Sequence, residues 1–323
     1  MISVLLPTYN SASIIGHSIK SILNQTFHDY ELLILDDGST DDTESIVSQF
    51  KDGRIRYLKY PHHGLSETLN AGLREAKCEI VARMDAGDLS LPERFEKQYY
   101  YLSKSPYNTI VSSRYAVFTR NKFQYIVSAP IDQNTIRKQL ALFPAFAHSG
   151  VMYYRSFIID NGMYRSIPME DYDIWLRIKD LSVFHILDEV LLFVEYVEGR
   201  LSTQNVAQKY KFIYILQQPY YIDLQLHFGI SDKCEENLYR GWREYFYGDK
   251  EKARKYWIKL GLTIFRQPRV ILAWFVTYLP ENIFLTFKEA RIRFRLQYLL
   301  QYFSREYCNL RKVFAAIIKD GYK

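Results

Sequence analysis

The chain of 323 residues has few cysteines and no long hydrophobic run. Its three cysteines lie far apart without a C-x-x-C pair, which argues against a disulfide framework or a zinc site and favours a reducing compartment. The longest apolar run, Val270 to Leu279, has about ten residues, whereas a membrane-spanning helix needs roughly 20. We therefore expect no transmembrane segment.

Glycine-rich phosphate loops are also missing. Neither G-x-G-x-x-G nor G-x-x-x-x-G-K-[ST] occurs where a strand would pass into a helix, which disfavours a dehydrogenase and a P-loop ATPase. The opening residues, MISVLLPTYN, lack the basic region of a secretory signal and reach Pro7 early. We expect them to form a strand of a cytoplasmic protein.

Charge divides the chain near residue 206. Residues 207–323 carry 21 Lys and Arg against 11 Asp and Glu, whereas residues 1–206 carry 21 against 25. We predict a first domain over 1–206 and a basic, aromatic-rich helical region over 207–323. That region either packs on the first domain or contacts the inner face of the cell membrane peripherally. Nucleic acid is not an expected partner, because no recognition motif accompanies the basic charge.

Short apolar runs alternate with helix-length amphipathic segments in the first part of the chain. The alternation predicts an α/β fold, with a mostly parallel sheet flanked by helices. Strands are expected over 2–6, 32–35, 55–60 and 79–84, and helices over 13–24, 41–50 and 65–76. Two later segments, 109–119 and 148–155, also read as strands.

Polar or acidic residues follow each of the first four predicted strands, where ligands bind in such a sheet. Carboxylates would repel a diphosphate directly, but they suit a hard divalent cation that shares oxygen ligands with phosphate. The sequence therefore predicts a nucleotide site that holds Mn²⁺ or Mg²⁺. The four tips are Pro7 to Asn10, Asp36 to Ser39, Pro61 to Gly64 and Asp85 to Asp88.

Three segments together resemble a family 2 glycosyltransferase of the GT-A fold, of the type found in bacterial polysaccharide assembly. They are ISVLLPTYNSASIIGHSIKSILNQTFHDYELLILDDGSTDDT, LNAGLREAKCEIVARMDAGDLSLPERF and MEDYDIWLR, and the resemblance covers roughly residues 1–205. It implies transfer of a sugar from a nucleotide-sugar donor, commonly UDP-linked, to a saccharide acceptor. It further implies that residues 1–206 form a nucleotide-sugar-binding and catalytic domain of the GT-A fold. It also implies a lipid-linked acceptor, such as one carried on polyprenyl diphosphate, inversion at the anomeric carbon, and a role in capsule, O-antigen or exopolysaccharide synthesis.

The resemblance also assigns donor contacts. Tyr9 offers a ring for stacking on a pyrimidine, and an aspartate accepts a hydrogen bond from the base or the ribose. Arg83 lies on the same strand face as Asp85, so it pairs either with Asp85 or with a donor phosphate. The predicted donor-binding residues are Pro7, Thr8, Tyr9, Asp36, Asp37, Arg83 and Asp85.

The expected metal motif departs from the family pattern at Gly87. Family members often read D-A-D-D there, and the third letter is the metal-binding aspartate. Asp85 remains as a ribose or metal ligand, and Asp88 is the nearest substitute for the missing ligand if Gly87 lets the loop turn it toward the cation. Alternatively, Asp88 caps the helix that opens near Pro92.

Two acids stand at the start of a predicted helix in MEDYDIWLRIKD. The resemblance makes Asp171, with Glu170 beside it, the catalytic base that removes the proton of the acceptor hydroxyl. A helix N-terminus favours the charged carboxylate, so we expect it to lower the pKa of Asp171.

Two further residues are candidate acceptor or phosphate contacts. His148 opens the predicted strand 148–155, and Arg200 lies in EYVEGRLST, where relatives often carry a histidine that this chain lacks. Gly87 and the missing histidine leave an alternative function open. The chain would then be a non-catalytic nucleotide-sugar-binding or scaffolding protein of a polysaccharide assembly complex.

Overall fold

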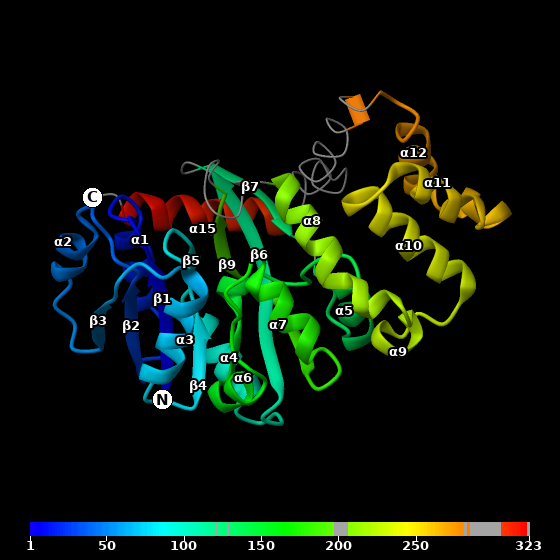
Figure 1. Ribbon diagram of the computed structural model, residues 1–323. Coiled ribbons are helices and arrows are strands. Elements are labelled where there is room, and N and C mark those ends of the chain that lie inside the picture. Colours follow the sequence, from blue (N-terminus) through cyan, green and yellow to red (C-terminus); the bar gives the residue numbers. More distant parts are fainter. Residues whose placement is uncertain (120–121, 128, 197–205, 281–282, 285–304, 322–323) are drawn as a thin grey trace.

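Four parallel strands alternate with three helices in the first part of the chain. A computed structural model describes residues 1–119, 122–127, 129–196, 206–280, 283–284 and 305–321 (Figure 1). The strands are β1 (Ile2–Thr8), β2 (Tyr30–Asp36), β3 (Ile55–Lys59) and β4 (Ile80–Arg83). The helices are α1 (Ile15–Leu23), α2 (Thr43–Ser48) and α3 (Leu65–Glu75). The predicted order is confirmed.

The sheet runs in the order β3-β2-β1-β4-β8-β6-β9-β5, with β7 added beside β6. Its pairs are parallel from β3 to β4 and again between β6 and β9, and the other pairs are antiparallel. The α/β class is therefore confirmed, with a mixed sheet. The later strands are β5 (Leu89–Ser90), β6 (Thr109–Thr119), β7 (Lys122–Val127), β8 (Met152–Tyr154) and β9 (Val183–Glu195).

Helices cover both faces of the parallel strands, which explains the apolar runs Val4–Leu6, Leu32–Leu35 and Ile80–Ala82 within β1, β2 and β4. Alternate residues of β1 belong to different hydrophobic clusters: Leu5 packs with α3, and Val4 packs with α1. Every residue of β1 and β2 is buried. The remaining helices of this part are α4 (Arg94–Leu102), α5 (Gln133–Leu140), α6 (Arg155–Asp160) and α7 (Glu170–Ile178).

The predicted strand 148–155 is wrong at both ends. Residues 148–150 form a 3-10 turn, η1 (His148–Gly150), and α6 begins directly after β8. The carbonyl of Ser149 accepts a hydrogen bond from Arg94 at 2.9 Å, and that of Gly150 accepts one from Gln98 at 2.7 Å. Both donors are buried side chains of α4, so these carbonyls are satisfied without a neighbouring strand.

The C-terminal region is helical in its described part, as predicted. The helices are α8 (Val206–Gln217), α9 (Leu224–Phe228), α10 (Lys233–Tyr247), α11 (Lys250–Ile258), α12 (Pro268–Val276) and α15 (Arg305–Gly321), with 3-10 turns η2 (Gln218–Tyr221) and η3 (Gly261–Arg266). Among the described residues, no helix has both the length and the apolar character to span a bilayer. The division at residue 206 stays a prediction.

These helices use three different hydrophobic clusters. Residues of α8 and α9 share a core with α7, whereas α10 to α12 pack around the buried Trp257. The helix α15 returns to the sheet, where Phe314 contacts Phe118, Phe123 and Phe193. Figure 1 shows α10 to α12 at the opposite end of the molecule from β1 to β3, and α15 crossing near the ends of β7 and β9.

Gly72 sets the approach of α3 to the parallel strands. A Cβ atom there would lie 2.4 Å from Leu35 Cδ1 and 3.2 Å from a methyl group of Leu5. Because both leucines are fully buried, we expect Gly72→Val to lower the free energy of unfolding by about 1–3 kcal/mol through overpacking. Urea denaturation measures this. Gly53→Val adds the same side chain where no atom lies within 4 Å and serves as the control. Equal stabilities of the two variants would contradict the tight packing.

Candidate active site

The ends of β2, β1 and β4 lie side by side at one edge of the sheet. Thr8 is paired with Asp36, and Leu5 is paired with Arg83. Neighbouring strands are about 4.8 Å apart, so the three strands span about 10 Å across this edge, and β4 ends at the level of Leu5, three residues before Thr8. The structure thus brings the loops after Thr8, Asp36 and Arg83 to one edge, as the sequence predicts.

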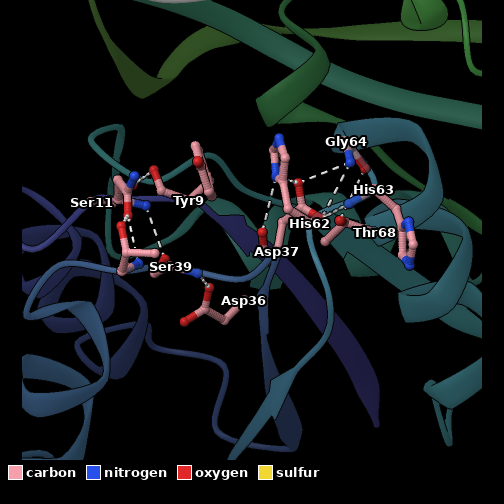
Figure 2. Close-up of polar contacts among 11 residues, drawn as sticks. Tyr9, Ser11, Asp36, Asp37, Ser39, His62, His63, Gly64 and Thr68 are labelled. Carbon is pink, nitrogen blue, oxygen red and sulfur yellow. Dashed lines mark hydrogen bonds and ion pairs between the residues drawn. The ribbon is translucent and has the colours of Figure 1, made fainter.

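Asp36 and Asp37 organise the loops at this edge. The Asp36 carboxylate accepts hydrogen bonds from the Ser39 amide at 2.7 Å and from the Tyr57 hydroxyl. The Asp37 carboxylate accepts hydrogen bonds from the amides of His63 at 2.8 Å and Gly64 at 3.0 Å (Figure 2). Both aspartates are buried. They therefore connect the turn after β2 to β3 and to the start of α3.

An aromatic pair lies above Asp37. The Tyr9 ring stacks on the His62 ring with centroids 4.3 Å apart, and His62 Nδ1 lies 2.8 Å from the Asp37 carboxylate. Tyr9 is 46% exposed, so part of its surface remains open to a ligand. The neighbouring Thr8 hydroxyl is buried and has no hydrogen-bond partner among the described residues. We assigned no role to His62 from sequence, although it follows the third strand.

A buried arginine links the loop after β4 to the rest of the site. The Arg83 guanidinium forms an ion pair with Asp85, which confirms one of its two expected partners. Its side chain is 1% exposed, whereas that of Asp85 is 44% exposed. Although burial lowers the pKa of Arg83, the charges of Asp85 and Glu170 raise it above its usual value. Arg83 therefore remains positively charged next to Asp85.

Asp88 is turned away from the surface. It is 3% exposed, and its carboxylate accepts a hydrogen bond from the Glu195 amide of β9 at 2.9 Å. The backbone of Gly87 has a φ of 102°, a conformation that glycine adopts readily. Helix α4 begins at Arg94 without a side-chain cap, so Asp88 does not supply its N-cap. The predicted role of Asp88 as a metal ligand stays a prediction.

The two acids of α7 lie at its first turn, as predicted, but their pKa values differ from the expectation. Burial, followed by the charge of Asp171, raises the pKa of Glu170 to about 7. Burial also raises the pKa of Asp171, and a hydrogen bond from the Tyr172 amide at 2.7 Å opposes this only in part. The expected lowering by the helix N-terminus is wrong, because desolvation outweighs it.

Arg83 and the two acids form one electrostatic cluster. The charge of Arg83 lowers the pKa values of Glu170 and Asp171, whereas the charge of Asp85 raises both. Lys209 of α8 also interacts electrostatically with both acids. We did not identify Lys209 from sequence, because one lysine in a basic region carries no distinguishing signal.

His148 lies beside this cluster. Its Nε2 atom is 3.1 Å from the Tyr164 hydroxyl, which is 3.2 Å from the Tyr153 hydroxyl. Burial, together with the charge of Arg83, lowers the pKa of His148 well below its usual value. The imidazole is therefore neutral at pH 7 and suited to hydrogen bonding. Arg200, the other candidate contact, lies outside the described residues.

The described residues contain no group of three or more His, Cys, Asp and Glu side chains that could hold a metal ion. A magnesium-type site does not require one, because Mg²⁺ is commonly held by one or two carboxylates together with substrate phosphates and waters. The exposed carboxylate of Asp85 fits that kind of shared site.

Comparison with known proteins identifies the family. The family model described as glycosyl transferase family 2 matches residues 3–162. The O-antigen biosynthesis glycosyltransferase WbnJ of Escherichia coli is 34% identical over 219 residues, covering 65% of this chain and 84% of that protein. The chain belongs to glycosyltransferase family 2. The amylovoran biosynthesis glycosyltransferase AmsE of Erwinia amylovora is 30% identical and covers 56% of this chain and 71% of its own length.

Solved structures confirm the GT-A-type fold of this glycosyltransferase. The crystal structure of Staphylococcus aureus TarS residues 1–349 with UDP-GlcNAc aligns with a TM-score of 0.58 at 18% identity, covering 87% of this chain and 82% of TarS. The mannosyltransferase PcManGT of Pyrobaculum calidifontis with GDP-Man and Mn²⁺ aligns with a TM-score of 0.54 at 14% identity, covering 98% and 84%. Family membership makes the chain a transferase and does not support the non-catalytic alternative.

Replacing Arg83 tests the electrostatic cluster directly. Arg83→Met removes a cation that lowers the pKa values of Glu170 and Asp171, so we expect both pKa values to rise. Carbon-13 NMR titration of the labelled carboxyl groups measures the change. Arg56→Met, which removes an ion pair with Glu31 and Glu75, is the control. Unchanged titration in Arg83→Met would show that Arg83 does not act on these acids.

Proposed function

We propose that this glycosyltransferase moves a sugar from a UDP-sugar donor to a saccharide acceptor in the synthesis of O-antigen, capsule or exopolysaccharide. The proposal rests on the position of Arg83. This arginine interacts with Asp85, Glu170 and Asp171 next to the strand ends that carry Asp36 and Asp37, so a pair of acids adjoins a nucleotide-type edge. The names of WbnJ and AmsE support the polysaccharide context. The TarS structures with UDP and UDP-GlcNAc support the choice of nucleotide.

The nucleoside would lie against the ends of β1 and β2. In this proposal, the half-exposed Tyr9 stacks on the base, and Asp37 accepts a hydrogen bond from it. Asp36 and the backbone of Pro7 and Thr8 line the bottom of this subsite. Because the Asp37 carboxylate already receives two amide hydrogen bonds, its position is set before a donor arrives.

Asp85, and Asp88 if its loop rearranges, would hold Mn²⁺ or Mg²⁺ together with the donor diphosphate. When bound, such an ion neutralises charge on the leaving diphosphate. Arg83, buried and paired with Asp85, orients this carboxylate and adds positive charge on the diphosphate side of the site. The PcManGT structure with Mn²⁺ supports a divalent cation.

Asp171 would act as the base. Its carboxylate takes the proton of the acceptor hydroxyl while that oxygen bonds to the anomeric carbon and the bond to the diphosphate breaks, with inversion. Burial raises the pKa of Asp171, which makes the carboxylate a stronger base than an exposed one. Glu170, His148 and Arg200 are proposed to contact the acceptor or the phosphates. A lipid-linked acceptor would bring the enzyme peripherally to the inner face of the cell membrane.

A donor screen tests the function. UDP-, GDP- and TDP-sugars are incubated with the full chain in the presence of Mn²⁺, Mg²⁺ or EDTA, and release of the nucleoside diphosphate is measured. We expect turnover of a UDP-sugar with a divalent cation and loss of that turnover in EDTA. Turnover that persists fully in EDTA would contradict the metal proposal, and turnover of GDP-sugars alone would contradict the nucleotide.

Asp171→Asn separates chemistry from binding. The substitution preserves shape but removes the base, so we expect kcat to fall by about 10²–10⁴-fold. Binding of UDP, measured by calorimetry, should change little, because Asp171 lies on the acceptor side. Asp160→Asn, an exposed aspartate at the end of α6, is the matched control. Normal turnover by Asp171→Asn would remove Asp171 as the base.

A further inference from the structure

Exposed apolar side chains concentrate in one short stretch of the C-terminal region. Among the described residues, nine large hydrophobic side chains are at least 59% exposed, and six of these lie in the stretch from Ile258 to Tyr278. We call these six the η3–α12 face. They are Ile258, Leu262, Phe265, Leu272, Phe275 and Tyr278.

The packing of α12 explains why this face points outward. Val270, Ala273 and Val276 are buried in the cluster around Trp257, so the opposite side of the helix carries Leu272 and Phe275. In η3, Leu262 and Phe265 are three residues apart, and side chains at that spacing line up along a 3-10 helix. The exposure of Leu272 and Phe275 therefore follows from a helix whose other side is buried. No residue of η3 is fully buried, and Ile264 packs partly against the same cluster.

The stretch that carries the η3–α12 face is also rich in positive charge. Between residues 252 and 280 the sequence has six Lys and Arg and no Asp or Glu. Five of these cations, Lys252, Lys255, Lys259, Arg266 and Arg269, are exposed. The sixth, Arg254, donates a hydrogen bond to the Thr277 carbonyl at 2.8 Å and lies over the Tyr278 ring. These contacts connect α11 to the end of α12.

We infer that the η3–α12 face binds the surface of an anionic lipid bilayer, with its apolar side chains inserted among the lipids and its cations at the head groups. Leu and Phe beside Lys and Arg are the composition of interfacial membrane-binding segments. A second copy of the chain is a poor occupant, because a symmetric contact would bring the two cationic borders together. A protein partner is also a poor occupant, because the cores of protein interfaces contain few lysines, whereas this stretch contains Lys252, Lys255 and Lys259.

This inference deepens the proposed function, since it supplies the surface where a lipid-linked acceptor would be met. The face lies at the end of the molecule away from β1 to β3 (Figure 1). Vesicle binding is measured without donor or acceptor. Loss of vesicle binding would therefore count against the membrane inference alone, and absence of sugar transfer would count against the proposed function alone.

The test is co-sedimentation of the full chain with vesicles of phosphatidylglycerol and phosphatidylcholine, compared with pure phosphatidylcholine. We expect binding to the anionic vesicles that weakens as salt is raised. The double variant Leu262→Ser with Phe265→Ser should bind about tenfold more weakly or worse, because two inserted side chains are lost. Lys259→Gln with Arg266→Gln should also bind about tenfold more weakly, since two head-group contacts are removed.

Ile222→Ser with Leu226→Ser is the matched control, because these side chains are comparably exposed but lie outside the face. Circular dichroism verifies folding of each variant. Equal binding to neutral and anionic vesicles would overturn the inference, as would unchanged binding of the Leu262 and Phe265 variant or equal loss in the control. A wild-type dimer that this variant converts to a monomer would assign the face to self-association and also overturn it.

Discussion

The site depends on one buried cation, Arg83. An arginine removed from water needs partners, and here the Asp85 carboxylate supplies a direct one while Glu170 and Asp171 act over longer range. The dependence is mutual, because three carboxylates gathered without a cation would repel one another. Arg83 therefore lets Asp85, which follows β4, and the two acids of α7 interact with one another in one electrostatic cluster.

Burial, more than the helix dipole, sets the chemistry of the acids. Glu170 and Asp171 both lie at a helix N-terminus, where the backbone favours negative charge. Desolvation acts in the opposite direction and is the larger effect at both residues. The result is a pair of carboxyl groups whose proton affinity is higher than that of surface acids.

Two structural assemblies have separate hydrophobic packing in the described part of the chain. The parallel strands hold the loops after Asp36 and around Asp85 in register through backbone pairing. The helices α10 to α12 have their own core around Trp257, and several of their apolar side chains are exposed. The edge of the sheet and the η3–α12 face are therefore stabilised by different sets of buried residues.

Local pattern was sufficient for the parallel strands, the first three helices and the positions of five acids at a strand end, on loops or at a helix start. These acids are Asp36, Asp37, Asp85, Glu170 and Asp171. Apolar periodicity and the ends of apolar runs report these features directly. The orientation of Asp88 depended on its contact with Glu195 of β9, which lies far along the chain. The turn at His148 depended on Arg94 of α4, which bonds the Ser149 carbonyl. The raised pKa values of the α7 acids likewise required tertiary packing.

The sequence by itself determined which residues end the strands, because neighbouring residues define those ends. Only the tertiary structure decided which of those side chains are desolvated and what they face, because burial is a property of residues brought together from distant parts of the chain.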